Sequence, residues 1–144
     1  TKLHSTEFIS RASDDDAERV AFDRVVFNFP HAAGKMNLRR NRELVEAFFE
    51  STTEILSERG EILVALLRGQ GGTESEIAGL FLRDDDDKEP VSSRKRAYDA
   101  SFRVDVLAAN AGLRVIDTVL VPLYTSSMHR NQRVVGVVFA NAPA

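Results

Sequence analysis

The stretch Phe22–Phe29 has the sequence FDRVVFNF and is followed at once by Pro30. β-Branched and aromatic residues dominate it over the length of one strand, which predicts a β-strand. Pro30 ends this strand, because proline has no N–H to donate to a neighbouring strand. We expect the strand to be buried on both faces from Val25 to Phe29. Residues 1–21 form a lead-in with too few apolar residues to start a core.

A helix and a second strand follow. Apolar residues recur with a period of 3.6 from Leu38 to Ser57, which predicts a helix with Asn37 or Asn41 as its N-cap and Gly60 as its stop signal. The run EILVALL (residues 61–67) is almost wholly apolar, as in strands of parallel sheets covered on both faces. Residues 22–68 therefore predict a strand, a helix and a parallel strand with a right-handed crossover.

The second half of the chain predicts a helix and a final hairpin. Residues 69–95 contain four glycines and a run of four aspartates, so they are a flexible insertion that is either functional or disordered. A helix is expected over residues 96–111, with Tyr98, Phe102, Val106 and Ala109 on one face. Strands are expected over 113–123 and 133–139. Residues 96–140 thus form the helix and the terminal hairpin.

These elements predict one α/β domain, the second half of a doubly wound sheet with a final antiparallel hairpin. No strand with a glycine-rich turn precedes Phe22, so the first strand is expected at an open sheet edge, with about half a domain upstream. Sheets of this kind bind ligands outside the carboxyl ends of their strands. Those ends are residues 28–31, 68–72 and 122–126.

The composition excludes functions that depend on cysteine and permits binding to nucleic acid. The chain has 144 residues, is 43% apolar and contains no cysteine, so disulfide scaffolds, thiolate metal sites and cysteine nucleophiles are excluded. The net charge is -3, but residues 14–18 and 84–89 hold nine acids and one base. The other residues comprise 13 acids and 18 bases, a net charge of +5. A mildly basic folded part permits binding to nucleic acid.

Four segments resemble the C-terminal half of the rRNA (uridine-N3)-methyltransferase-like family. They are FDRVVFNFPHAAGK (22–35), NRELVEAFF (41–49), GEILVALLRGQGG (60–72) and LAANAGLRV (107–115). That family includes the methyltransferase-like region of ferredoxin-fold anticodon-binding domain-containing proteins, and the resemblance runs from about Thr1 to Phe139. It implies a Rossmann-like class I methyltransferase fold, S-adenosylmethionine as cofactor, and methylation of uridine N3 in rRNA in the cytoplasm or nucleolus. It also implies that the main cofactor-binding turn lies upstream.

Asn28, Phe29, Pro30 and His31 are similar to the Asn-Pro-Pro-aromatic motif of methyltransferases that act on planar nitrogens. A reaction at uridine N3 must hold a flat base and remove one imide proton. Asn28, Pro30 and His31 are therefore the candidate catalytic residues: Asn28 to hold the base and the imidazole of His31 to accept the proton. Asn28 and Phe29 are the candidate cofactor contacts. The alternative is a turn that merely ends the strand.

Candidate RNA contacts lie at the start of the first predicted helix and in the glycine-rich turn after the second strand. Cations at the start of a helix oppose its dipole, which favours a role in binding phosphate over a simple solvated helix start. Gln70, in the Gly-Gln-Gly-Gly turn, could bond a base edge, or the turn could be a flexible exit into the insertion. The candidates are Lys35, Arg39, Arg40, Arg42 and Gln70.

Two functions stay open at this point. One is an RNA methyltransferase with S-adenosylmethionine as cofactor. The other is a catalytically inactive methyltransferase-like module that binds rRNA or tRNA within a larger protein. Asp84–Asp87 lack the alternating spacing of a calcium loop, so we expect no metal site, and we expect no membrane segment.

Overall fold

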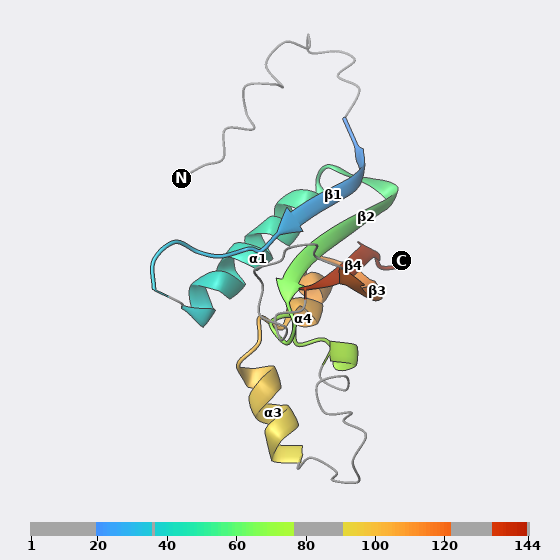
Figure 1. Cartoon of the computed structure of the whole chain (residues 1–144). Coiled ribbons are helices and arrows are strands. Elements are labelled where there is room, and N and C mark those ends of the chain that lie inside the picture. Colours follow the sequence, from blue (N-terminus) through green and yellow to red (C-terminus); the bar gives the residue numbers. More distant parts are fainter. Residues whose placement is uncertain (1–19, 36, 77–90, 122–133, 144) are drawn as a thin grey trace.

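The computed structural model describes residues 20–35, 37–76, 91–121 and 134–143 (Figure 1). Helices and strands alternate in the first part, and a strand pair closes the described chain. The elements are β1 (Phe22–Asn28), α1 (Leu38–Thr53), β2 (Leu56–Leu67), α3 (Val91–Asp99), α4 (Val104–Asn110), β3 (Leu113–Val121) and β4 (Val134–Asn141).

The described strands form a single sheet in the order β1-β2-β4-β3. β1 pairs with β2 in parallel, whereas β4 pairs antiparallel with both β2 and β3. This confirms the predicted parallel pair and final antiparallel hairpin. Because β1, β2 and β3 run in the same direction, their carboxyl ends meet at one edge of the sheet.

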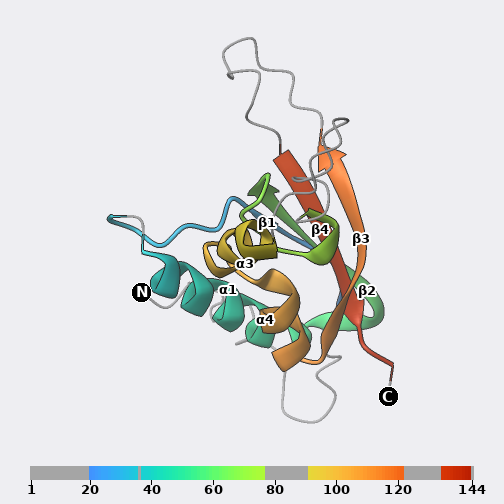
Figure 2. The ribbon, with the colours of Figure 1, turned by 90° about the horizontal axis from the view of Figure 1, so that it is seen from below.

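Helices α1 and α4 lie on the same face of the sheet and enclose the core with it (Figure 2). The Phe49 ring of α1 packs edge-on against Phe139 of β4, with centroids 4.8 Å apart, and Phe48 lies 4.4 Å from Phe27 of β1. Alternate residues of the central strands point into this core and are fully buried. They include Ile62, Val64, Leu66, Val137 and Phe139.

β1 is not buried on both faces, contrary to the prediction. It lies at an edge of the described sheet, as predicted. Helix α1 covers one face through Phe27, but Val26 points to the other face and is 54% exposed. An apolar run predicts burial on both faces only where layers cover both faces, and in the described residues α1 and α4 cover only one.

α1 ends four residues earlier than predicted, and Gly60 lies inside β2 instead of stopping the helix. Thr52 accepts the N–H of Ile55 at 3.0 Å, and the carbonyl of Ile55 accepts the N–H of Phe22 at 2.7 Å. The chain thus leaves the helix to pair with the start of β1. β2 consequently runs from Leu56, five residues before the predicted strand.

The helix predicted over residues 96–111 is broken into α3 and α4. Arg103 has φ 55°, a left-handed conformation that interrupts the helix. Phe102 and Val104 donate their N–H groups to the carbonyls of Gln70 and Gly71, at 2.6 and 3.0 Å, instead of to the preceding turn. The predicted apolar face is therefore wrong at Val106, which is 43% exposed.

The predicted insertion at 69–95 is partly regular. Residues 69–76 form a turn and a helical turn, and α3 starts at Val91. The rest of the insertion, residues 77–90, lies outside the described residues. So do residues 122–126 of the expected ligand edge and the link between the last two strands.

Candidate functional site

The segment Asn28–His31 occupies the carboxyl end of β1, as expected. Phe29 donates its N–H to the Ala65 carbonyl of β2 at 2.9 Å, which fixes the chain to the sheet where the strand ends. Phe29 has φ 52° and is 46% exposed. Pro30 is buried, whereas Asn28 and His31 are exposed. The motif therefore presents an amide, an aromatic ring and an imidazole on a backbone anchored to the sheet.

A buried asparagine holds the loop that follows this motif. Of the two predicted caps, Asn37 is the N-cap of α1 and accepts the N–H of Arg40 at 3.2 Å. Asn41, one turn further on, is fully buried. Its Oδ1 accepts the N–H of Ala32 at 2.7 Å and so ties the loop to the helix.

The four candidate cations do not share one environment. Lys35, Arg39 and Arg40 are exposed, and Arg39 forms a surface ion pair with Glu43 at 2.9 Å. Exposed pairs of this kind contribute little to stability, so the Arg39 guanidinium can exchange its partner for a phosphate. Arg42 is half-buried and points the other way, toward the junction of α3 and α4.

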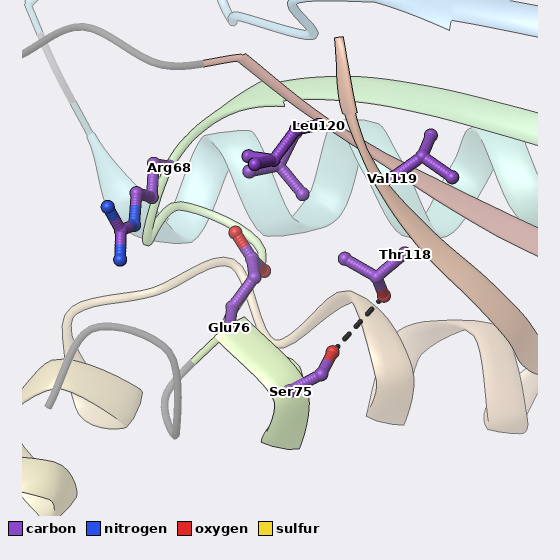
Figure 3. Close-up of a pocket in the computed structure, with 7 residues that line it drawn as sticks. Arg68, Ser75, Glu76, Thr118, Val119 and Leu120 are labelled. Carbon is purple, nitrogen blue, oxygen red and sulfur yellow. Dashed lines mark hydrogen bonds between the residues drawn. The ribbon is translucent and has the colours of Figure 1, made fainter. Parts of the chain in front are cut away.

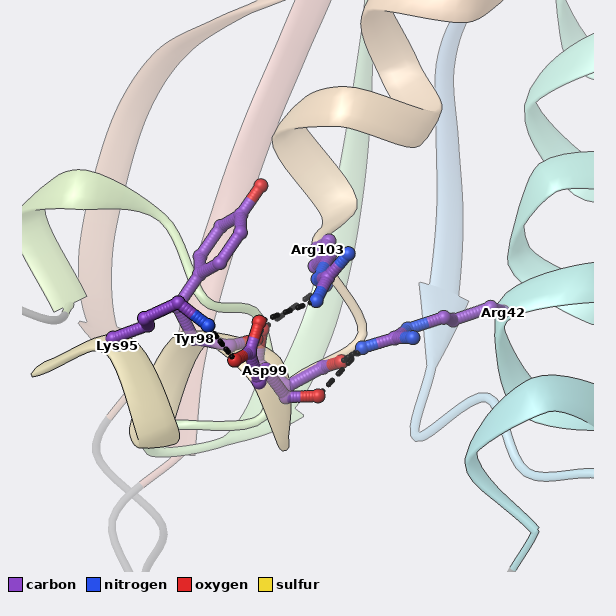
Figure 4. A network of polar contacts seen from close by, with 6 residues as sticks. Arg42, Lys95, Tyr98, Asp99 and Arg103 are labelled. Carbon is purple, nitrogen blue, oxygen red and sulfur yellow. Dashed lines mark hydrogen bonds and ion pairs between the residues drawn. The ribbon is translucent and has the colours of Figure 1, made fainter. Parts of the chain in front are cut away.

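Arg42 belongs to a polar network at that junction (Figure 4). Its guanidinium donates to the Ser101 carbonyl from Nε and Nη2, at 3.1 and 2.6 Å, and to the Asp99 carbonyl at 2.9 Å. Burial, together with the positive charge of Arg103, lowers the pKa of Arg42. A hydrogen bond from Lys95 lowers the pKa of Asp99, with a further contribution from Arg103. Arg103 also lies 4.9 Å from the ring centroid of Tyr98.

Gln70 lies in a compact turn after β2. Its Oε1 accepts the N–H of Leu67 at 3.0 Å, and its own N–H donates to the Leu67 carbonyl at 2.9 Å. Gly69 and Gly72 have φ 88° and 73°, conformations that side chains rarely adopt. The side-chain oxygen of Gln70 thus stabilises the turn, and its amide N–H₂ is the part that could contact a base.

A cavity of about 240 Å³ lies between β2, the helical turn at 74–76 and β3 (Figure 3). Arg68 and Glu76 line it, and a 3.2 Å hydrogen bond joins Ser75 to Thr118 across it. The Glu76 carboxylate is 5% exposed and accepts N–H groups from Gly69 and Thr73. Sequence reasoning missed these residues, although the pattern Thr73-x-x-Glu76 is the signature of a helix capping box.

Comparison with known proteins identifies the family. The family described as rRNA (uridine-N3-)-methyltransferase BTM5-like matches residues 1–122. The chain belongs to this family. Together with the sheet order, membership confirms the predicted α/β, Rossmann-like methyltransferase fold class. The family resemblance noted in the sequence is thereby confirmed over residues 1–122, whereas the prediction extended it to Phe139.

Two mammalian proteins are similar over part of their length. The chain is 34% identical over 116 residues to the mouse ferredoxin-fold anticodon-binding domain-containing protein 1 homolog, and 38% identical over 96 residues to the human protein. These matches cover 77% and 67% of this chain. The chain spans only 16% and 13% of those relatives.

Solved methyltransferases are also similar. The CcbJ methyltransferase from Streptomyces caelestis is 11% identical with a TM-score of 0.46, covering 89% of this chain and 60% of that chain. The 16S rRNA (adenine(1408)-N(1))-methyltransferase W203A mutant from Catenulisporales acidiphilia is 16% identical with a TM-score of 0.43, covering 84% and 50%.

Two further features bear on the class of site. In the described ranges, no three histidine or acidic side chains gather closely enough to ligate a metal. Among the helices of those same ranges, none has the length and apolar character that crossing a membrane requires.

Proposed function

We propose that this chain is the substrate-binding part of a methyltransferase domain that transfers a methyl group from S-adenosylmethionine to N3 of a uridine in rRNA, in the cytoplasm or nucleolus. The supporting observation is the conformation of Phe29 at the carboxyl end of β1. A bulky residue at φ 52° costs conformational energy, and such strain is concentrated at ligand-binding positions. Here the strained residue presents a ring that is 46% exposed in the motif where the reaction needs a flat surface.

The exposed groups of the motif suit the chemistry. S-adenosylmethionine, when bound, supplies an activated methyl group on a sulfonium. Asn28 and Phe29 are accessible from solvent, so both can border such a cofactor as well as a planar base. The amide of Asn28 can bond the imide edge of uridine, while Phe29 stacks on the ring. A ring nitrogen of His31 would accept the proton that N3 must lose when it is methylated.

The exposed cations next to the motif are suited to bind the phosphates of the RNA substrate. Lys35, Arg39 and Arg40 lie just after the motif and can contact phosphates on either side of the target nucleotide. A uridine in a duplex must be unstacked to reach the motif, and phosphate contacts next to the site hold the strand while the base is displaced.

A methyl-transfer assay tests this function. The complete gene product is incubated with rRNA and methyl-labelled S-adenosylmethionine, and the digested RNA is analysed for 3-methyluridine. We expect His31→Ala and Asn28→Ala to lower the rate about 100-fold or more, as loss of a general base or an orienting group does. Asn110→Ala, an exposed asparagine at the end of α4, is the matched control and should keep full activity.

The possible outcomes separate the two functions left open by the sequence. Labelled 3-methyluridine that both motif substitutions abolish supports the enzyme. Binding of RNA without any methyl transfer would instead support a methyltransferase-like binding module. Full activity in both variants would remove the assignment of the motif as the site.

A further inference from the structure

Two neighbouring residues of α1 contact two loops at the carboxyl edge of the sheet, the loop that ends β1 and the loop that joins α3 to α4. Asn41 reaches the loop after the Asn28–His31 motif, and Arg42 reaches the junction of α3 and α4, against which the glycine turn packs. The two side chains leave the same turn of the helix in different directions.

The side chain of Asn41 connects the loop after the motif to the buried side of α1. It is fully buried, and its Oδ1 lies 2.7 Å from the Ala32 nitrogen, one residue beyond His31. The Phe29 N–H is bonded to Ala65 at 2.9 Å. The backbone from Phe29 to Ala32 is therefore held at either end, by a hydrogen bond to the Ala65 carbonyl and by one to the Asn41 side chain.

Arg42 supports the second loop through its planar guanidinium. Nε and Nη2 both donate to the Ser101 carbonyl, and Nη2 also donates to the Asp99 carbonyl. Residues next to Ser101 bind the glycine turn, since Phe102 and Val104 donate to Gln70 and Gly71. A Cβ at Gly72 would collide with the Ser101 side chain, so the turn and the junction are in direct contact.

We propose that Asn41 and Arg42 are positioning residues, which hold the motif loop and the glycine turn in fixed places at the carboxyl edge of the sheet. This reassigns Arg42, which the sequence predicts to be an RNA contact. The proposal rests on the proposed function for what the loops bind, but the order of the motif loop can be measured without any substrate.

The hydrogen bonds of Arg42 allow a role in positioning a loop to be distinguished from a role in binding phosphate by charge. A phosphate contact needs a positive charge, which lysine also supplies. The Ser101 carbonyl is bound from both Nε and Nη2 of one planar guanidinium while Nη2 also reaches Asp99, an arrangement that the single ammonium nitrogen of lysine does not reproduce. Arg40, exposed two residues earlier, provides a cation whose side chain points to solvent.

The first experiment measures order in the motif loop of the chain itself. The sequence contains no tryptophan, so Phe29→Trp introduces a single tryptophan at an exposed aromatic position, and its fluorescence can be excited selectively. In this background we expect Asn41→Leu to raise the acrylamide quenching constant about twofold, because the loop loses its bond to α1. Thr52→Val removes another buried polar group of α1, whose hydroxyl donates to the Phe48 carbonyl, and should leave quenching unchanged.

Two further variants keep this test decisive. Asn41→Ser is used if Asn41→Leu does not fold, because serine is too short to reach Ala32. Asn41→Asp keeps an oxygen in place and should restore the low quenching constant. An unchanged quenching constant in a folded variant without the acceptor would overturn the role of Asn41.

The second experiment measures RNA affinity of the same chain against salt concentration. We expect Arg42→Lys and Arg42→Gln to weaken binding equally, about fivefold, with the salt slope unchanged. Arg40→Gln should lower the slope by about 0.7 to 0.9, the value of one lost phosphate contact. Native affinity in Arg42→Lys, with a reduced slope in Arg42→Gln, would make Arg42 a phosphate contact and overturn its positioning role. If the unmodified chain binds no RNA, the proposed function fails while the quenching result still stands.

Discussion

At the scale of single residues, Phe29 combines two features that stability alone does not favour. Its backbone is left-handed, at φ 52°, and its ring is 46% exposed. A left-handed conformation costs roughly 1–2 kcal/mol for a residue with a Cβ, whereas glycine adopts it freely. Stability alone gives no advantage to phenylalanine over glycine at this position. The phenylalanine is therefore better explained by what its exposed ring contacts.

This argument predicts the effect of Phe29→Gly. We expect the free energy of unfolding to change by less than about 1 kcal/mol, since relief of backbone strain offsets the lost ring contacts and the larger entropy of glycine in the unfolded chain. RNA affinity should fall severalfold, because base stacking contributes about 1–3 kcal/mol per base. Urea unfolding and fluorescence anisotropy with labelled RNA measure the two quantities.

Phe29→Leu is the matched control, since leucine keeps the Cβ and the strain but cannot stack as an aromatic ring does. It should lose affinity without gaining stability. A loss of stability above about 2 kcal/mol in Phe29→Gly would show that the ring is needed for packing, and the strain would then carry no functional meaning.

At the scale of elements, the sequence predicts types and order better than ends. Runs of β-branched and apolar residues predict all four described strands, and the period of 3.6 predicts the existence of α1, because these patterns reflect burial against one core. The end of α1 could not be predicted, because it depends on the pairing of Phe22 with Ile55, which are 33 positions apart. The break at Arg103 likewise depends on hydrogen bonds to Gln70 and Gly71, from another part of the chain.

The same limit applies to the candidate site. The motif at 28–31 is local in sequence, and its place at a strand end could be predicted from Pro30 and from the direction of the strand. Whether a cation faces solvent or the protein depends on its position around the helix and on what packs there. Arg40 and Arg42 look equivalent in the sequence, but only Arg42 meets the carbonyls of another loop.

Gly60 provides a prediction at this scale. A Cβ at this position would lie 2.9 Å from the Phe22 carbonyl oxygen and 2.6 Å from Cδ1 of Leu56. We expect Gly60→Ala to destabilise the chain by about 1–3 kcal/mol, because β1 must move away from β2 to make room. At a glycine with an ordinary φ and free space, the same change stabilises by up to about 1 kcal/mol.

The sign of the change in urea midpoint is therefore decisive for Gly60. Gly112→Ala is the companion variant, because a Cβ there meets nothing within 4 Å and only the φ of 78° opposes it. A more stable Gly60→Ala protein would show that β1 and β2 are not packed as closely as the structure has them.

At the scale of the whole molecule, the two edges of the described sheet differ. Both edge strands carry charged residues and a register shift, features that discourage pairing with another strand. Both also expose apolar side chains, Phe22 at 48% and Val26 at 54% on β1 and Leu120 at 63% on β3. The exposed apolar Val26 lies near the middle of β1, however, whereas the middle of β3 is the charged Asp117. An apolar edge strand of this kind is a template for pairing with another chain.

We therefore expect the isolated chain to self-associate through β1 as its concentration rises. Val26→Lys places a charge in the middle of that strand and should weaken association at least about tenfold, because pairing would bury the ammonium group. Val106→Lys is the control, since Val106 is 43% exposed but belongs to the helix α4 and not to an edge strand. Sedimentation velocity over a range of concentrations compares the two variants with the unmodified chain. If Val106→Lys weakens association and Val26→Lys leaves it unchanged, the contact lies on the helical face and β1 has no role in it.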